Sequence, residues 1–271
     1  MSRIKGTFER LAKEKAGAYI PYVCAGDPDA EFTVSLATGL LDSGADILEL
    51  GIPFSDPVAD GPVIQGAMNR SLGGGFKVGG TFSIVESIRR KGYDQPIVLM
   101  TYSNPVLRMG VADFCARASK AGADAVLMVD MPPEESRELD SRAKENGLDV
   151  IRLVAPSTSD ARIGEIVSKG SGFLYAVSAA GVTGARSSLP ESARTLLGRV
   201  VLQARLPVVL GFGISSPEHV KEALRAGARG VVEGSALVST YAPLAGDRVK
   251  AVDSVARHAS AMKAAAIGRS T

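Results

Sequence analysis

The sequence predicts an α/β protein folded as a single (β/α)₈ barrel, a TIM barrel, and three observations support this fold class. Eight short apolar segments of strand type alternate with amphipathic helical segments along the 271 residues. The strand segments are apolar throughout, which is typical of a parallel sheet covered by helices on its outer face. A barrel of this kind takes roughly 250 residues, so one domain over residues 1–271 accounts for the chain.

An open, doubly wound sheet is the alternative architecture. If such a sheet bound a dinucleotide, a glycine-rich fingerprint would follow its first strand. The segment after the first predicted strand reads CAGDPDAE and has no such fingerprint. Eight strand-helix units therefore favour the closed barrel.

The elements can be assigned in chain order. Residues 2–16 form an extra amphipathic N-terminal helix, in which Ile4, Phe8 and Leu11 share one face before Gly17 ends the pattern. Strands are predicted over Ala18–Cys24, Asp46–Gly51, Pro96–Tyr102, Asp124–Asp130, Asp149–Ala155, Gly172–Ser178, Pro207–Gly213 and Gly230–Val238. Helices are predicted over Glu31–Ser43, Pro62–Leu72, Thr81–Lys91, Val111–Ala121, Pro133–Asn146, Asp160–Lys169, Leu189–Ala204, Ser216–Ala226 and Val249–Ala265.

Local signals support these boundaries. Ser216 and Pro217 fit an N-cap followed by proline at the first helical position. A weak internal repeat begins at residues 43, 121 and 226, reading SGADILELG, AGADAVLMVD and AGARGVVEGS. Each copy has a glycine where a helix ends and a strand begins, so the repeat indicates one recurring structural unit.

Composition excludes several classes of function. The net charge is +2 with both signs mixed, so neither nucleic acid nor an anionic membrane is an expected partner. The N-terminus lacks the apolar core of a secretory signal and no apolar run reaches 18 residues, which predicts a cytoplasmic protein. The two cysteines, Cys24 and Cys115, are expected to be buried, and His219 and His258 to lie on helix surfaces. No metal site is predicted.

Two connections are longer than a barrel requires, the elaborated loops after strands 2 and 6. The first runs from Gly51 to Pro96 and includes an extra short helix; the second runs from Ala179 to Ser188 and is small and polar. Both follow the carboxyl ends of strands, where barrels of this fold carry their chemistry, and glycine-rich loops often act as lids.

Carboxyl groups gather around the first of these loops. Glu49 lies near the end of an apolar strand, and Asp56 and Asp60 follow in the loop. Burying a lone acid is costly unless the acid is protonated, paired or hydrated. Each of these states suits an acid catalyst, but a structural glutamate bonded to a neighbouring loop is equally compatible with the pattern.

Glycines follow three late strands, at Gly181–Gly184, Gly211–Gly213 and Gly234 before Ser235. Their exposed backbone N–H groups would form an anion cradle, which predicts a phosphate ester as ligand. These glycines would lie at the carboxyl-terminal end of the predicted barrel, its mouth. The side chains expected to line this mouth are largely apolar, and they are Tyr22, Met100, Tyr102, Leu127, Val129, Leu153, Tyr175 and Phe212. This combination favours acid–base chemistry by carboxyls over Schiff-base chemistry.

The run from Glu49 to Pro62, ELGIPFSDPVADGP, resembles the signature of the tryptophan synthase alpha subunit family. The resemblance continues in YIPYVCAGDP from residue 19, AGVTGAR from residue 180 and GFGISSPE from residue 211, and it fades only near the C-terminus. It implies a (β/α)₈ lyase that cleaves indole-3-glycerol phosphate to indole and D-glyceraldehyde 3-phosphate in L-tryptophan biosynthesis. It also implies an αββα heterotetramer with a beta subunit, pyridoxal phosphate in that partner, and no cofactor in this chain.

The resemblance also assigns roles to residues. It places the acid–base glutamate at Glu49 and the second catalytic carboxylate at Asp60. Phosphate contacts fall on Gly184, Gly213, Gly234 and Ser235, with Thr183 in the lid and Tyr175 beside the substrate.

Three positions depart from the family pattern. Ala179 stands where some relatives carry arginine, and Tyr22 replaces a phenylalanine at the wall of the indole site. Glu233 adds an acid beside the phosphate loop, and strand alternation predicts that it points away from Gly234.

Two other functions fit parts of the pattern. Another phosphate-binding barrel, such as a sugar-phosphate isomerase, would use the same glycines, and a noncatalytic regulatory partner of the beta subunit would keep the fold. The intact pair Glu49 and Asp60 favours catalysis. Two loops at the mouth, at Asp56-Pro57 and Asn104–Val111, are expected to meet the partner.

Overall fold

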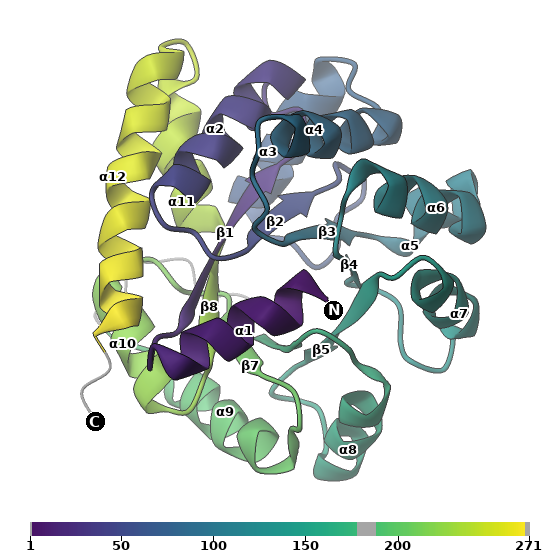
Figure 1. Cartoon of the computed structure of the whole chain (residues 1–271), viewed down its shortest axis with the longest axis vertical. Coiled ribbons are helices and arrows are strands. Elements are labelled where there is room, and N and C mark those ends of the chain that lie inside the picture. Colours follow the sequence, from purple (N-terminus) through teal and green to yellow (C-terminus); the bar gives the residue numbers. More distant parts are fainter. Residues whose placement is uncertain (1, 178–187, 269–271) are drawn as a thin grey trace.

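The computed structural model describes residues 2–177 and 188–268. Its centre is a closed barrel of parallel strands in which each strand pairs with its neighbours in the sequence and β8 (Gly230–Glu233) closes on β1 (Ala18–Cys24). Helices surround this barrel on its outer face (Figure 1). The predicted (β/α)₈ fold is therefore confirmed.

The strands begin and end close to the predicted positions. After β1 they are β2 (Leu48–Gly51), β3 (Ile97–Thr101), β4 (Ala125–Met128), β5 (Asp149–Val154), β6 (Leu174–Val177), β7 (Val208–Gly211) and β8. All except β5 and β6 are buried along their whole length, as expected for strands covered by side chains on both faces.

The helices follow the predicted alternation. They are α1 (Arg3–Lys13), α2 (Ala30–Asp42), α3 (Pro62–Gly73), α4 (Val78–Arg90), α5 (Ser103–Met109), α6 (Val111–Ala121), α7 (Arg137–Glu145), α8 (Asp160–Lys169), α9 (Glu191–Gln203), α10 (Pro217–Arg225), α11 (Ser235–Tyr241) and α12 (Arg248–Ile267), with a short 3₁₀ turn at Ala242–Leu244. The expected N-cap is present, since the Ser216 side chain accepts a hydrogen bond from the His219 N–H and Pro217 starts α10. The extra helix in the loop after β2 is α3.

Two local predictions are wrong. The eighth strand ends at Glu233 rather than Val238, because the backbone turns at Gly234 and the apolar residues that follow belong to α11. The Asn104–Val111 stretch, expected as a loop, is mostly helix α5, with its proline in the first turn, where a missing N–H breaks no helical bond. Of the loop after β6, residues 178–187 lie outside the described residues.

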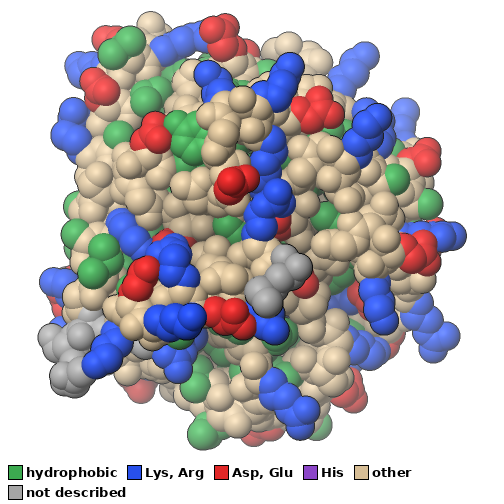
Figure 2. Space-filling view, in the orientation of Figure 1, with side chains coloured by type: hydrophobic (Ala, Val, Ile, Leu, Met, Phe, Trp, Pro, Cys, Tyr) green, Lys and Arg blue, Asp and Glu red, His purple; other side chains and the backbone are tan. Residues whose placement is uncertain are grey.

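Helix α1 closes the amino-terminal end of the barrel, across its near side in Figure 1. Aspartates at the starts of three strands hold it there. Arg10 bonds Asp46 at 2.9 Å, Arg3 bonds Asp124 at 3.0 Å, and the Ser2 hydroxyl donates to Asp149 at 2.6 Å. Lys, Arg, Asp and Glu side chains are interspersed over the visible part of this face (Figure 2).

Asp46 and Asp124 occupy the same position of the internal repeat and make the same kind of contact. Asp46 accepts a hydrogen bond from the Tyr19 N–H at 3.0 Å, and Asp124 accepts one from the Ile97 N–H at 2.8 Å. Each aspartate thus holds the first residues of the preceding strand of the barrel. Lys263 of α12 adds a 2.6 Å ion pair to Asp46, so this carboxylate also ties the last helix to the sheet.

Replacing Asp46 with alanine tests this anchoring. The change leaves two cations and a backbone N–H without their acceptor, and breaking a buried ion pair costs about 3 kcal/mol or more. We expect the free energy of unfolding, measured with urea, to fall by about 3 kcal/mol. Glu9→Ala is the control, because Glu9 lies 3.8 Å from Lys5 on an exposed surface, where such pairs contribute about 0.5 kcal/mol. Equal losses in both variants would contradict the anchoring role.

Candidate active site

Strand register decides which side chains face the barrel interior. On β1, the Tyr19 hydroxyl lies outside the barrel, where it donates to Glu233 beside helix α12. Because side chains alternate along a strand, Tyr22 points inward. Tyr22 is the register partner of Glu49 on β2, and register partners share a face of the sheet. Glu49 therefore points into the barrel.

Glu49 is buried in the barrel interior, close to Asp60 and to the rings of Tyr22 and Tyr175. The residue is 2% exposed, and its Oε2 has no hydrogen-bond partner among the described residues. Burial, followed by the charge of Asp60, raises the pKa of Glu49 to about 8. A carboxyl in this state is protonated at neutral pH and able to donate a proton. Of the states that the sequence left open, the structure supports the protonated acid, since residues 2–177 and 188–268 provide no partner for Oε2.

Asp60 lies near Glu49 but in a more polar setting. Its Oδ2 accepts a 2.6 Å hydrogen bond from the Tyr102 hydroxyl, which in turn accepts one from the Ala59 N–H at 3.1 Å. Burial raises the pKa of Asp60, and the bond from Tyr102 opposes that rise. Two carboxyls whose surroundings differ in this way can hold different protonation states and take different roles.

The rings of Tyr22 and Tyr175 fit inside the barrel because the positions next to them are glycines. A Cβ at Gly51 would lie 2.2 Å from the Tyr22 hydroxyl oxygen, and a Cβ at Gly211 would lie 2.2 Å from Cε1 of Tyr175. Any larger residue at either glycine would displace a tyrosine ring. The sequence indicated turns at these glycines but not this packing, because the requirement comes from the neighbouring strand.

The glycines after β7 and β8 form an open corner of the mouth. Gly213 and Ser235 are exposed and Gly234 is half-buried. Phe212 has a φ of 67°, which is uncommon for a bulky residue and is found mostly at functional sites. Backbone groups of this corner are thus accessible to a ligand. Thr183 and Gly184, the remaining predicted contacts, lie outside the described residues, as does Ala179.

The apolar residues predicted for the mouth come from neighbouring strands. Gly51 pairs in register with Met100, and Met100 with Leu127, so these side chains share the inward face with Glu49. Met100, Leu127 and Tyr175 are nearly fully buried, and Phe212 is half-buried. The ring of Tyr102 packs against Phe54 with centroids 5.3 Å apart. The predicted site residues that are described thus come from strands and loops that meet at the carboxyl end of the barrel.

Glu233 lies behind this corner rather than in it. Its carboxylate accepts the 2.7 Å bond from Tyr19 and lies 2.6 Å from Nε2 of His258 on α12, and the residue is fully buried. The side chain therefore points away from Gly234, as strand alternation predicted. The expectation that both histidines lie on the surface is wrong for His219. This residue of α10 is 1% exposed, and its Nδ1 accepts a hydrogen bond from the Ser215 N–H.

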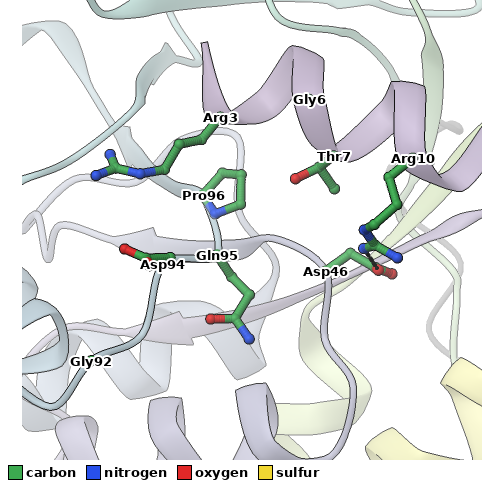
Figure 3. A pocket seen from close by; sticks show the side chains of 9 residues that line it. All are labelled: Arg3, Gly6, Thr7, Arg10, Asp46, Gly92, Asp94, Gln95 and Pro96. Atoms are coloured by element: carbon green, nitrogen blue, oxygen red, sulfur yellow. Dashed lines mark hydrogen bonds and ion pairs between the residues drawn. The ribbon is translucent and has the colours of Figure 1, made fainter. Parts of the chain in front are cut away.

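A polar cleft opens at the opposite, amino-terminal end of the barrel (Figure 3). It is lined by Arg3, Gly6, Thr7, Arg10, Asp46, Gly92, Asp94, Gln95 and Pro96. Its arginines are already bonded to the aspartates that anchor α1, and no predicted site residue lines it. Within residues 2–177 and 188–268, no group of three or more His, Cys, Asp or Glu side chains is placed to hold a metal ion, and no helix is long and apolar enough to cross a membrane.

Sequence comparison identifies relatives over most of the chain. The family model for the tryptophan synthase alpha chain matches residues 8–267. The tryptophan synthase alpha chain of Geobacillus thermodenitrificans is 51% identical over 220 residues, which cover 81% of each chain. That of Methanosarcina acetivorans is 47% identical over 236 residues, covering 87% of this chain and 85% of the relative.

Solved structures agree with the sequence relatives. Tryptophan synthase subunit alpha from Legionella pneumophila superposes with a TM-score of 0.89 at 36% identity, covering 98% of each chain. A structure of the tryptophan synthase a2b2 complex from Pyrococcus furiosus, described in terms of mutual activation, matches with a TM-score of 0.86 at 43% identity and covers 91% of this chain and 98% of that one. With a buried acid and an open glycine corner at the mouth of a matching barrel, the chain belongs to the tryptophan synthase alpha chain family.

Proposed function

We propose that this chain performs its family's reaction, the alpha reaction of tryptophan synthase, with Glu49 and Asp60 as the catalytic carboxyls. The family establishes a lyase of tryptophan biosynthesis. The substrate is indole-3-glycerol phosphate and the products are indole and D-glyceraldehyde 3-phosphate. The single observation that carries the residue assignment is the buried Oε2 of Glu49, which has no partner among the described residues and faces the barrel mouth.

The protonated Glu49 starts the reaction by delivering its proton to C3 of the indole ring. The positive charge that this leaves on the ring is centred on nitrogen, and ionised Asp60 stabilises it by accepting a hydrogen bond from the ring N–H. The bond between C3 and the glycerol chain then breaks, its electron pair returns to the ring, and the adjacent hydroxyl loses its proton to Glu49. Indole and an aldehyde result, and Glu49 is protonated again. No step of this scheme requires a cofactor in this chain.

The phosphate end of the substrate binds at the open corner formed by Gly213, Gly234 and Ser235. The family resemblance adds Gly184, which lies outside the described residues. Backbone N–H groups exposed by glycines are suited to hold an anion. The apolar and aromatic wall, comprising Tyr22, Met100, Tyr102, Leu127, Tyr175 and Phe212, contacts the rest of the substrate, and Thr183 belongs to the lid. Burial of the indole ring among these side chains supplies binding energy, while the carboxyls act only on the reacting atoms.

The mouth also provides a docking surface for a beta subunit, in an αββα assembly in which the pyridoxal phosphate belongs to the partner. Two apolar side chains are exposed there, Val58 in the loop after β2 at 83% and Leu107 on α5 at 54%. Apolar groups left open beside an active site are typical of an interface. A partner over the mouth would also retain indole, which is apolar and would otherwise escape to water.

Conservative replacement of the two acids tests the catalytic assignment. Glu49→Gln and Asp60→Asn keep the shape of each side chain. General acid–base catalysis contributes ~10²–10⁴-fold, so we expect the cleavage rate of each variant to decrease by a factor in that range. Asp94→Asn, in the cleft at the other end of the barrel, is the matched control and should keep its rate. If the cleavage rate of Glu49→Gln decreased by less than about tenfold, the assignment of Glu49 as the proton-transfer residue would be wrong.

The same assay run against pH separates an acid from a structural glutamate. Because protonated Glu49 supplies the first proton, kcat/KM should fall as pH rises through about 8, and it should fall at low pH as Asp60 becomes protonated. A pKa raised by folding means that ionisation opposes folding above the ordinary glutamate pKa. Glu49→Gln should therefore be at least as stable as the parent at neutral and higher pH. A flat profile through about pH 8 would contradict the acid role.

Gly234→Ala tests the phosphate corner. A Cβ at Gly234 has room, with Ile64 Cδ1 at 3.8 Å and Tyr22 Cβ at 3.9 Å, so the fold should accept the methyl group while the anion loses space. Gly213 is less suitable, because its φ of 78° strains any other residue. We expect KM to rise about tenfold or more, the equivalent of one charge-assisted hydrogen bond. Gly198→Ala on α9, where a Cβ meets nothing within 4 Å, is the control, and equal KM values in the two variants would place the phosphate elsewhere.

A charge placed on the docking surface tests the partner assignment. Leu107→Asp should raise the Kd for a cognate beta subunit about tenfold or more, because burying a charge without a partner is costly. Leu202→Asp is the matched control, since Leu202 is an 88% exposed leucine on the side of the barrel. Titration of each variant with beta subunit gives both constants. Equal weakening by the two substitutions, or none by Leu107→Asp, would exclude this surface.

A further inference from the structure

Two tyrosines of strand β1 differ in how their hydroxyls are satisfied. Tyr19 points out of the barrel and donates a 2.7 Å hydrogen bond to Glu233. Tyr22, three residues later, points into the barrel and is 3% exposed. Its hydroxyl oxygen has no nitrogen or oxygen partner among the described residues, and its polar neighbour on the same strand is the thiol of Cys24, a weak hydrogen-bonding group. A buried hydroxyl without a strong partner costs stability, and a bound ligand can supply the partner that the described residues do not.

The Tyr22 side chain spans the proposed substrate site. Its Cβ lies 3.9 Å from the position of a Cβ at Gly234, which belongs to the phosphate corner. Its hydroxyl lies over Gly51, 2.2 Å from the position of a Cβ there, at the end of the strand that carries Glu49. A ligand that reaches from the corner to the carboxyls therefore passes along this ring.

The hydroxyl can act only as a neutral donor or acceptor. Burial, with smaller contributions from Cys24, Asp60 and other nearby acidic groups, raises the pKa of Tyr22 well above its ordinary value. The phenol thus keeps its proton at neutral pH, and the proton is available for donation.

The chemistry of the substrate identifies the acceptor. The phosphate group of the substrate is already bound at the glycine corner. The indole ring has an N–H donor but no oxygen that could accept a hydrogen bond. Only the hydroxyl oxygens of the three-carbon chain between them can accept. Resting on the proposed function, we propose that the Tyr22 hydroxyl donates a hydrogen bond to a hydroxyl oxygen of the glycerol chain of the bound phosphate ester.

Binding of two small ligands separates this contact from the phosphate corner. sn-Glycerol 3-phosphate carries both the phosphate and the hydroxyls, whereas inorganic phosphate carries only the anion. Calorimetric titration of the parent and of Tyr22→Phe with each ligand should show that the variant binds glycerol 3-phosphate about fivefold more weakly, the equivalent of one neutral hydrogen bond. Its affinity for inorganic phosphate should be unchanged.

Thermal unfolding without ligand distinguishes a ligand contact from a structural one. Removing a hydroxyl that has no partner should leave the Tm of Tyr22→Phe equal to that of the parent or higher. Tyr19→Phe is the matched comparison, because it removes a partnered hydroxyl from the same strand and leaves the buried Glu233 with one bond fewer. Its Tm should fall. A Tm that falls in Tyr22→Phe as it does in Tyr19→Phe would show a structural role and overturn the inference.

The remaining outcomes are distinct. If Tyr22→Phe binds glycerol 3-phosphate as tightly as the parent does, or loses affinity equally for both ligands, the hydroxyl contact is overturned while the phosphate corner stands. If the parent protein binds neither ligand, the phosphate corner of the proposed function fails, and this inference fails with it.

Discussion

The site depends on one constraint, a buried carboxyl group inside a closed barrel, whose Oε2 has no hydrogen-bond partner in the described part of the chain. Closing the sheet removes its edges and fills its interior with side chains from every strand, so water cannot solvate Glu49. The ionised form is therefore disfavoured, and the pKa rises to about 8. Asp60 has different surroundings, because burial raises its pKa while the hydrogen bond from Tyr102 opposes that rise. The difference between the two acids thus comes from their surroundings rather than from their residue type.

Buried polar groups have different surroundings at the two ends of the barrel. At the amino-terminal end, Asp46 and Asp124 accept bonds from arginines and from backbone N–H groups, so their carboxylates stabilise the fold. At the carboxyl end, Oε2 of Glu49 and the Tyr22 hydroxyl are buried without partners among the described residues. Barrels of this fold commonly separate stability from chemistry in this way. Unsatisfied buried groups reduce stability, and a ligand that supplied their hydrogen-bond partners would recover that energy on binding.

Tyr22 illustrates how tightly the mouth is packed. Its ring fits only because Gly51 on the next strand lacks a side chain, and Gly211 makes the same room for Tyr175. The rings of Tyr22 on β1 and Tyr175 on β6 thus both enter the barrel interior and fill space near Glu49 and Asp60. Such packing holds the side chains around Glu49 in position, since rigid strands and close contacts limit their movement.

The sequence alone determined the order and type of the elements, because apolar runs and helical periodicity are local properties. The helices Val111–Ala121 and Asp160–Lys169 have the predicted bounds. Local patterns failed where one apolar run continued from β8 into α11, and where a proline lay within the first turn of α5. They also identified Glu49 and Asp60 as acids at a strand end and in a loop. Only the tertiary structure decided that Oε2 of Glu49 finds no partner among the described residues and that Asp60 is bonded to Tyr102, because pKa and hydrogen bonding depend on burial by residues far away in the sequence.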